Sequence, residues 1–474
     1  MKKIASLVRL ILFSALAFMV VLYCSSVFRP KKTELPNDTT NKIDGFYALE
    51  DNSMDVLFLG TSHTYYGFNP SILYMETGLS SYVFAGECQP AGVTYYYLKE
   101  ALKTQKPELI VIDVFSLLPS SEKCQTTGII KKNLEDFKFS RNKIEALKLI
   151  ENENLWENLF DISIYKNRWN EINNADLLYP LTKHFNENFG YTEGYPVDEP
   201  IYVRDRYETD ETMIADKEAL SYLFQIFLLA QKHDIDVLVV KTPYYKTEEE
   251  HKIINYIFEE ANEFGFHTLD FNQYYDELDF VFDRDGDVWH CNVRGAWKIT
   301  HYLSDYILDH YQVSLKASPY DEQYRLLYNK TIKHMLWTYL DSNEYLDYLS
   351  TLDVTLLINY NGKEEGWISD KNWELLHHIG IPTFNLHSDY AAVISGKETY
   401  FEHFSNLMLD NEIAVNDDII KCKSDGTTYK FVYNGEEVEY NHISLNVIVI
   451  DNMTKTVMDR LAFDVQNNLS ILRY

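Results

Sequence analysis

The strongest constraint on the fold is an alternation of short apolar runs with longer amphipathic stretches, from about residue 46 to residue 313. Apolar runs of strand length predict strands, and apolar residues at helical spacing predict the helices between them. The predicted strands are 55–59, 109–113, 236–240 and 267–270, and the predicted helices are 93–103, 217–233 and 248–264. This order favours an α/β fold with a parallel sheet and helices on both faces.

The chain of 474 residues is too long for one ordinary core, which predicts two domains. We assign residues 47–315 to the first domain, with a polar, aromatic-rich insertion or lid at about 120–212. A connector at 316–344 then leads to a smaller α+β, β-rich domain at 345–474. Its predicted strands are 354–359, 390–393, 429–433 and 444–451, and its predicted helix is 370–379.

Residues 10–28 form a run of nineteen residues without a charge, preceded by Lys2, Lys3 and Arg9. A run of this length predicts a helix that crosses the lipid bilayer. We interpret residues 1–28 as a short cytoplasmic tail and an uncleaved signal anchor, with a cleaved signal peptide as the alternative. Residues 29–46 are then a polar linker, and the globular part lies outside the cytoplasm on a single-pass membrane protein.

Charge and cysteine content exclude some classes of protein. The formal net charge of −29 argues against nucleic acid and anionic lipid as ligands and fits a neutral or cationic polymer. The five cysteines show no spacing typical of a metal knuckle or a disulfide framework, and we expect free thiols. His377 and His378 have no further ligand nearby, so we predict neither a metal nor a cofactor.

The first chemical motif is Gly60-Thr61-Ser62-His63, directly after the first predicted strand. In a parallel sheet, ligands bind outside the carboxyl ends of the strands. A serine in such a turn can lie near a base and near backbone N–H groups that stabilise an oxyanion. The alternative for Ser62 is an ordinary helix-capping hydroxyl.

The second motif is Asp287-Val288-Trp289-His290, near the end of the α/β region. A loop of this form can present the imidazole while the carboxylate orients it. The alternative is a turn whose aspartates cap a helix. A calcium loop is excluded, because Arg294 stands where such a loop needs glutamate.

Together, the two motifs resemble the SGNH, or GDSL-like, hydrolase family over roughly residues 46–313. The chain is most similar to the single-pass branch with alginate-type acetyltransferases and the D-alanyl transfer protein of teichoic acid modification. The resemblance implies that Ser62 is the nucleophile, His290 the base, and Asp287 the residue that orients His290. It also implies oxyanion donors at the N–H groups of Ser62 and Gly86.

Four further residues are candidates for substrate binding: His63, Gln89, Lys241 and Asn292. His63 either points into the site or lines the turn, and Lys241 either contacts substrate or is a charged residue that ends a buried strand. The chain departs from the family after the third strand. Residues 113–116 read DVFS and lack the family's asparagine donor, which Asn292 is a candidate to replace.

The C-terminal text, including VTLLINYNGKEEGW and SLNVIVID, resembles the interleukin-like EMT inducer domain over roughly residues 350–465. The resemblance implies a compact β-rich module that holds a glycan or a partner. Trp367 and Trp373 are either stacking surfaces for sugar rings or core residues.

The leading functional hypothesis is an acyl hydrolase or O-acyltransferase acting on O-acyl groups, acetyl above all, of an extracellular polysaccharide or wall polymer. The resemblance implies a multipass membrane partner that donates the acyl group. The alternative is a catalytically inactive glycan-binding or assembly protein of surface-polysaccharide biosynthesis. A secreted lipase or general esterase fits poorly with the membrane anchor.

Overall fold

The structure is a computed structural model that describes residues 2–31, 39–150, 154–195, 200, 209–286, 289–360, 362, 368–404, 407–426, 428–438, 444–467 and 469–473. The chain forms two compact units, Met1–Leu327 and Tyr328–Tyr474. The division falls within helix α15 (Asp321–Thr338), inside the stretch predicted as a connector.

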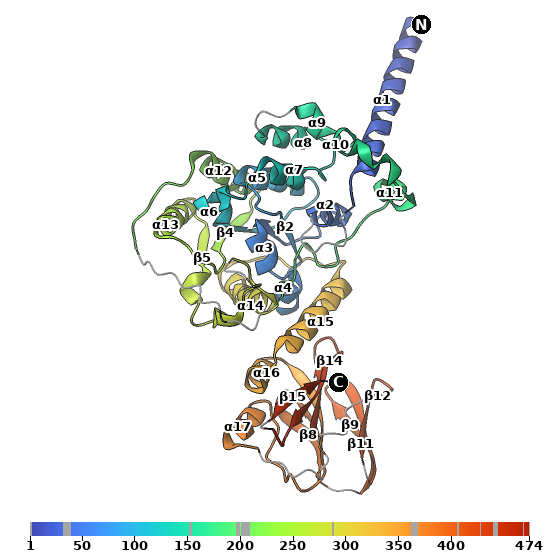
Figure 1. Ribbon diagram of the computed structural model, residues 1–474, viewed down its shortest axis with the longest axis vertical. Helices are drawn as coiled ribbons and strands as arrows, with labels where there is room; N and C mark the ends of the chain where they lie inside the picture. The colour runs from blue at the N-terminus through green and yellow to red at the C-terminus, as the bar shows by residue number, and fades with distance from the viewer. Residues whose placement is uncertain are drawn as a thin grey trace. The chain divides into compact units, whose positions relative to one another are not determined.

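The core of the first unit is a parallel sheet of five strands in the order β2-β1-β3-β4-β5 (Figure 1). The strands are β1 (Val56–Gly60), β2 (Ser81–Ala85), β3 (Leu109–Asp113), β4 (Asp236–Lys241) and β5 (His267–Asp270). Gly60 lies opposite Ala85, and Asp113 opposite Val240. The predicted α/β class with a parallel sheet is therefore confirmed, and β1 lies between β2 and β3.

Helices cover both faces of this sheet because alternate residues of each strand point to opposite sides. In β1, Leu57 and Leu59 belong to one buried cluster, and Val56 and Phe58 belong to another. The first cluster includes residues of α5 (Ala91–Ala101), α12 (Lys217–Lys232) and α13 (Glu248–Glu263), and the second includes residues of α4 (Pro70–Thr77) and α14 (Val293–His310). The strands are apolar throughout because they are buried on both sides.

A series of short helices lies between β3 and α12, and most of it falls in the insertion predicted at about 120–212. They are η1 (Val114–Leu117), α6 (Pro119–Glu122), α7 (Thr127–Leu134), α8 (Arg141–Ala146), η2 (Leu147–Leu149), α9 (Leu155–Leu159), α10 (Asp161–Tyr165), η3 (Lys166–Asn170), α11 (Asn174–Leu178) and η4 (Tyr179–Leu181). Three more short helices, α3 (Ser62–Gly67), η5 (Phe271–Tyr274) and η6 (Phe280–Phe282), follow β1 and β5.

The expectation of free thiols is wrong for two of the five cysteines. Cys88, in the loop after β2, and Cys124, after α6, form a disulfide with a Cα–Cα distance of 5.8 Å. Their 36-residue separation hid the pair in the sequence, because only the fold brings the two loops together. Cys24, Cys291 and Cys422 form no disulfide within the described part of the chain.

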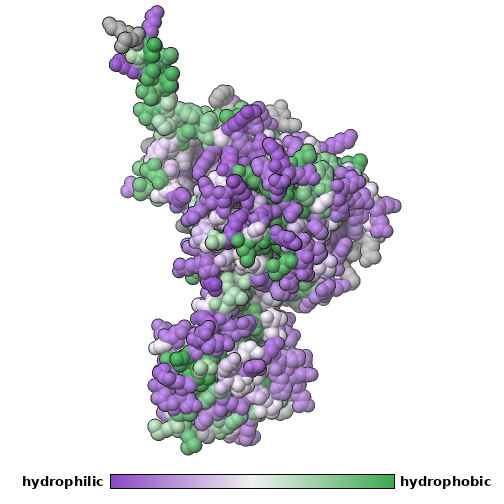
Figure 2. Space-filling model, turned by 180° about the vertical axis from the view of Figure 1, so that it is seen from behind, coloured by the Kyte–Doolittle hydropathy of each residue, from purple (hydrophilic) through white to green (hydrophobic). Residues whose placement is uncertain are grey.

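The N-terminal helix α1 (Lys2–Phe28) is long and apolar enough to span a membrane (Figures 1 and 2). The prediction of a linker at 29–46 is wrong for its last part, because helix α2 covers Thr39–Ala48. Ile43 and Phe46 of α2 are buried in the core of the unit. Two apolar residues at helical spacing are too few to predict a helix within a polar stretch.

The second unit is β-rich. A six-stranded antiparallel sheet has the order β15-β14-β13-β6-β7-β8, and a four-stranded one the order β12-β11-β10-β9. Their strands are β6 (Val354–Tyr360), β7 (Tyr390–Ser395), β8 (Glu398–His403), β9 (Met408–Val415), β10 (Asp418–Asp425), β11 (Tyr429–Tyr433), β12 (Glu436–Val438), β13 (Leu445–Asp451), β14 (Val457–Asp464) and β15 (Ser470–Arg473). Helices α16 (Ser342–Leu349) and α17 (Asp370–His378) complete the unit.

Candidate active site

Ser62 is the first residue of α3, immediately beyond the carboxyl end of β1. The turn depends on Gly60, whose φ of +147° is unfavourable for other residues and at which a Cβ would overlap Thr64 Oγ1. The helix is capped by Thr61, whose side chain accepts a hydrogen bond from the His63 N–H at 3.4 Å. Since Thr61 caps the helix, the Ser62 hydroxyl is not needed for that purpose.

His290 is presented by a loop that doubles back before α14. Arg284 pairs with Cys291 in an antiparallel bridge, and the Asp285 N–H donates to the His290 carbonyl at 3.2 Å. His290 Nε2 lies 2.9 Å from Ser62 Oγ, although 228 residues separate the two in the chain. Ser62 is buried, with an exposed fraction of 6%, and His290 is half-buried. The third predicted member, Asp287, lies outside the described residues.

A serine hydroxyl hydrogen-bonded to an imidazole nitrogen can transfer its proton as the oxygen attacks a carbonyl. The two groups come from opposite ends of the sequence of the α/β unit: Ser62 follows β1, and His290 lies in the loop before α14. The described structure therefore brings a serine hydroxyl and an imidazole together at the carboxyl edge of the sheet, where parallel-sheet proteins bind ligands.

Aromatic rings enclose the pair. The ring of Tyr66 lies 4.8 Å from that of His290. His63 is buried, and its ring lies 4.1 Å from Phe115, 4.3 Å from Tyr244 and 5.3 Å from His290. Burial, followed by the nearby charges of His290, Lys241 and Arg284, holds the pKa of His63 well below its usual value. His63 is thus a neutral part of the wall at neutral pH.

The loop after β2 brings Gly86 to the same edge of the sheet. The Gly86 N–H points at the Gly60 carbonyl, with an N–O distance of 3.4 Å, and a Cβ at Gly86 would overlap Asn133 Oδ1. Asn133 belongs to α7 of the insertion, is fully buried, and donates to the carbonyls of Glu87 and Ile129 at 2.9 and 3.0 Å. Sequence reasoning missed Asn133, because a single asparagine inside a polar insertion carries no local signal.

The loop after β2 is held in place by a disulfide and by a buried hydrogen bond. Cys88 has a φ of +43°, a value that non-glycine residues seldom adopt, and its disulfide ties the loop to the start of the insertion. Gln89 is fully buried, and its Nε2 donates to Thr94 Oγ1 at 2.9 Å. Gln89 therefore supports the loop from within, and its side chain has no exposed surface with which to contact a substrate.

At the end of β3, Asp113 occupies the region in which the family would have its asparagine. Its carboxylate accepts from the Phe115 N–H at 2.9 Å and from the N–H and hydroxyl of Thr242, each at 3.1 Å. Burial raises the pKa of Asp113 to about 6 against these hydrogen bonds. An acceptor-only carboxylate cannot donate to an oxyanion, so Asp113 ties β3 to β4 and does not replace the asparagine.

The structure also places the other two candidate substrate ligands away from solvent. Lys241 is fully buried, and its Nζ donates to the carbonyls of Thr242 and Tyr244 at 3.2 and 2.9 Å. Asn292 caps α14 by accepting from the N–H groups of Arg294 and Gly295, and it donates to the carbonyls of Phe282 and Arg284. Both side chains hold the backbone around the site.

Arg284 is a second residue that sequence reasoning missed. Its side chain is fully buried, and its three nitrogen atoms have no hydrogen-bond partner within the described ranges. Its charge lowers the pKa of His63, the residue next to Ser62. Arg284 therefore contributes, after burial, His290 and Lys241, to keeping His63 neutral.

Among the described residues, no group of three or more His, Cys, Asp or Glu side chains is placed to hold a metal ion. In the second unit, His377 Nε2 lies 2.9 Å from Thr383 Oγ1. Trp373 is half-buried, with its ring 5.3 Å from that of Phe384, and Trp367 lies outside the described residues.

Comparison of the chain with models of known protein families and with curated proteins gives no match.

Proposed function

We propose that this protein is a membrane-anchored serine acyl hydrolase or O-acyltransferase of the SGNH type, acting on O-acyl groups of an extracellular polysaccharide or wall polymer. The observation that carries the proposal is the 2.9 Å distance between Ser62 Oγ and His290 Nε2. Its support also includes the position of Ser62 after β1, a strand flanked by β2 and β3, and the ring of Tyr66 at 4.8 Å from that of His290.

In this proposal Ser62 Oγ attacks the ester carbonyl while His290 takes the hydroxyl proton, and Asp287 orients the imidazole. The Ser62 N–H stabilises the oxyanion, and Arg284 adds positive potential. The Gly86 N–H, which donates to the Gly60 carbonyl at 3.4 Å, must release that carbonyl before it serves as the second donor. The ester C–O bond then breaks, and His290 returns the proton to the departing alcohol. The acyl group on Ser62 is finally passed to water in hydrolysis or to a sugar hydroxyl in transfer.

The location outside the cytoplasm is part of the proposal. Helix α1, the one candidate span among the described residues, supports anchoring to the cell membrane. The Cys88–Cys124 disulfide supports an oxidising compartment, because such bonds are rare in the cytosol. The second unit would then hold the glycan or the partner, and a multipass membrane protein would supply the acyl group for transfer.

The test is labelling of the detergent-solubilised full chain with a fluorophosphonate, which reacts with activated serines. Ser62→Ala and His290→Ala are expected to abolish labelling. Ser314→Ala and His233→Ala, which change exposed residues of the same unit, should label like the parent. Circular dichroism of every variant separates lost chemistry from lost folding.

If the folded parent does not label, or if Ser62→Ala labels normally, the proposed chemistry is wrong, and the glycan-binding or assembly alternative becomes the one to test. If labelling follows Ser62 and His290, acetylated glycan and unmodified acceptor glycan distinguish the two reactions. Release of free acid in water indicates hydrolysis, and an acylated acceptor indicates transfer.

A further inference from the structure

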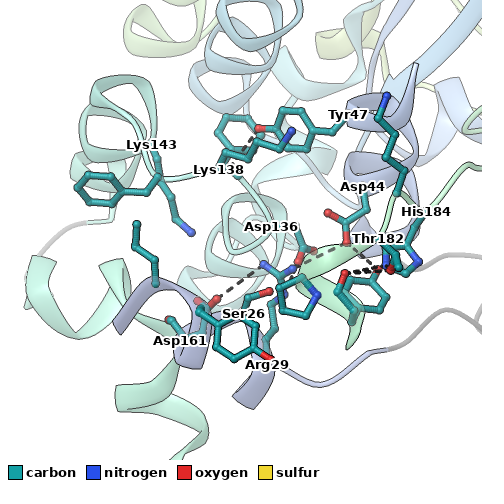
Figure 3. A pocket seen from close by; sticks show the side chains of 18 of the residues that line it. Ser26, Arg29, Asp44, Tyr47, Asp136, Lys138, Lys143, Asp161, Thr182 and His184 are labelled. Carbon is teal, nitrogen blue, oxygen red and sulfur yellow. Dashed lines mark hydrogen bonds and ion pairs between the residues drawn. The ribbon is translucent and has the colours of Figure 1, made fainter. Parts of the chain in front are cut away.

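A pocket lies at the foot of α1 (Figure 3), and Ser62 is not among its lining residues. Its volume is about 390 Å³, within the range that holds a small ligand. One wall is the last two turns of α1, with Leu22, Tyr23, Ser25 and Ser26. Because these turns end the apolar span, the pocket lies where α1 leaves the membrane.

The insertion surrounds this end of α1. The rings of Phe18 and Phe139 lie 5.0 Å apart, the Tyr23 hydroxyl donates to the Leu177 carbonyl at 2.7 Å, and Arg168 Nη1 donates to the Phe28 carbonyl at 2.7 Å. Large apolar side chains are exposed on these insertion segments, and we name them the collar: Phe139, Ile164, Trp169, Leu177, Leu178 and Leu181. Trp169 and Leu181 are 73% and 70% exposed.

Side chains of this kind next to a membrane-spanning helix are typical of segments that lie in the membrane interface. Apolar surface also gathers where α1 meets the unit in Figure 2. When α1 is inserted in a bilayer, the collar continues the apolar surface of α1, and the pocket then lies at the level of the lipid headgroups.

The charges of the pocket differ from those of the rest of the protein. Four cationic and three anionic side chains line it, a formal charge of +1 in a chain whose net charge is −29. The cations are Arg29, Lys138, Lys143 and Lys183, and the anions are Asp44, Asp136 and Asp161.

The anions are grouped around Arg29, which is buried. Its Nε lies 2.7 Å from Asp136, and its Nη atoms lie 3.8 Å from Asp44 and 3.7 Å from Asp161 (Figure 3). Lys143 donates to the Glu135 carbonyl at 2.7 Å. The exposed cations of the pocket are Lys138 and Lys183.

From this arrangement we propose that the pocket binds an anionic glycerophospholipid of the membrane that α1 enters. Lys138 and Lys183 hold the phosphate, and the acyl chains lie against α1 and the apolar collar. The bound lipid fixes the height and tilt of the unit above the bilayer. This inference rests on insertion of α1 in a membrane and is independent of the proposed catalytic chemistry.

The test is native mass spectrometry of the full chain in detergent, titrated with dioleoyl phosphatidylglycerol. Flotation with vesicles reports insertion of α1 separately. The parent is expected to retain one lipid, and K138E/K183E should lower its affinity at least about tenfold, since each Lys near an anionic lipid surface contributes roughly 1 kcal/mol. The matched control is K217E/K232E, which changes two exposed lysines of α12 by the same charge and should bind like the parent.

Dihexanoyl phosphatidylglycerol and inorganic phosphate distinguish a lipid site from a phosphate site. The short-chain lipid should bind more weakly than the dioleoyl lipid, and L178S/L181S in the collar should reduce that difference. Equal binding by the parent and K138E/K183E would overturn the proposal. The proposal would also be overturned if inorganic phosphate displaced the lipid and the two lipids bound equally well, because the site would then recognise free phosphate.

Discussion

Asn292 is the residue at which a structural role and a substrate-binding role can be separated most cleanly. Its side chain makes four hydrogen bonds between 2.8 and 3.1 Å and is fully buried. Asn292→Ala removes a helix cap, which costs about 1 kcal/mol, and leaves two buried carbonyls without a donor, each costing about 1–3 kcal/mol. We therefore expect a loss of about 3–7 kcal/mol in the local stability of α14.

Hydrogen exchange of α14 amides, followed by mass spectrometry, measures this loss directly. A decrease of about 3–7 kcal/mol corresponds to roughly a hundredfold to a hundred-thousandfold faster exchange, since 1.4 kcal/mol is a factor of ten. Asn292→Ser retains a capping oxygen and should recover about 1 kcal/mol of the loss. Asn262→Ala, at an exposed position of α13, is the control and should leave the exchange of α14 unchanged.

The labelling of Ser62 should slow in Asn292→Ala in parallel with the loss of protection, because Asn292 fastens the loop that presents His290. If α14 exchanges as in the parent while catalytic turnover falls, Asn292 contacts the substrate. That result would refute the structural role argued from its four hydrogen bonds.

Two further predictions concern the loops on either side of the site. The Cys88–Cys124 disulfide closes a loop with a separation of 36 residues, so Cys124→Ser should cost about 4 kcal/mol by loop entropy and lower the calorimetric melting temperature of the first unit. Alkylation of Cys88 in the unreduced parent would contradict the bridge. Burial raises the pKa of Asp113 to about 6, so the folded state holds the proton more tightly than the unfolded state. The protonated carboxyl stabilises the folded state by about 3 kcal/mol below pH 4, and this contribution is lost as the pH rises through 6. Denaturant titrations at several pH values should therefore show a decrease in the free energy of unfolding for the parent that Asp113→Asn lacks. Equal pH profiles of the two proteins would exclude the pKa shift.

The sequence by itself was sufficient for the order and type of the main elements. The strands β3 and β5 and the starts of α12 and α13 fall where the apolar periodicity places them. This works because strand and helix periods are local properties of short segments. The turn at Ser62 could also be predicted from the sequence, since a glycine and a serine after a buried strand indicate a sharp turn at the edge of the sheet.

The tertiary structure decided what the periodicity cannot carry. It placed β1 between β2 and β3, brought Ser62 to His290, set Asn133 beside Gly86, and joined Cys88 to Cys124. It also buried Gln89, Lys241 and Asn292, three residues that the sequence offered as substrate ligands. The side chains that the fold brings together lie 36 to 228 residues apart in the sequence. They meet only because the packing of the whole unit stabilises the fold by more than the entropy lost when the chain between them is closed into a loop. A local sequence pattern contains no information about that difference in free energy.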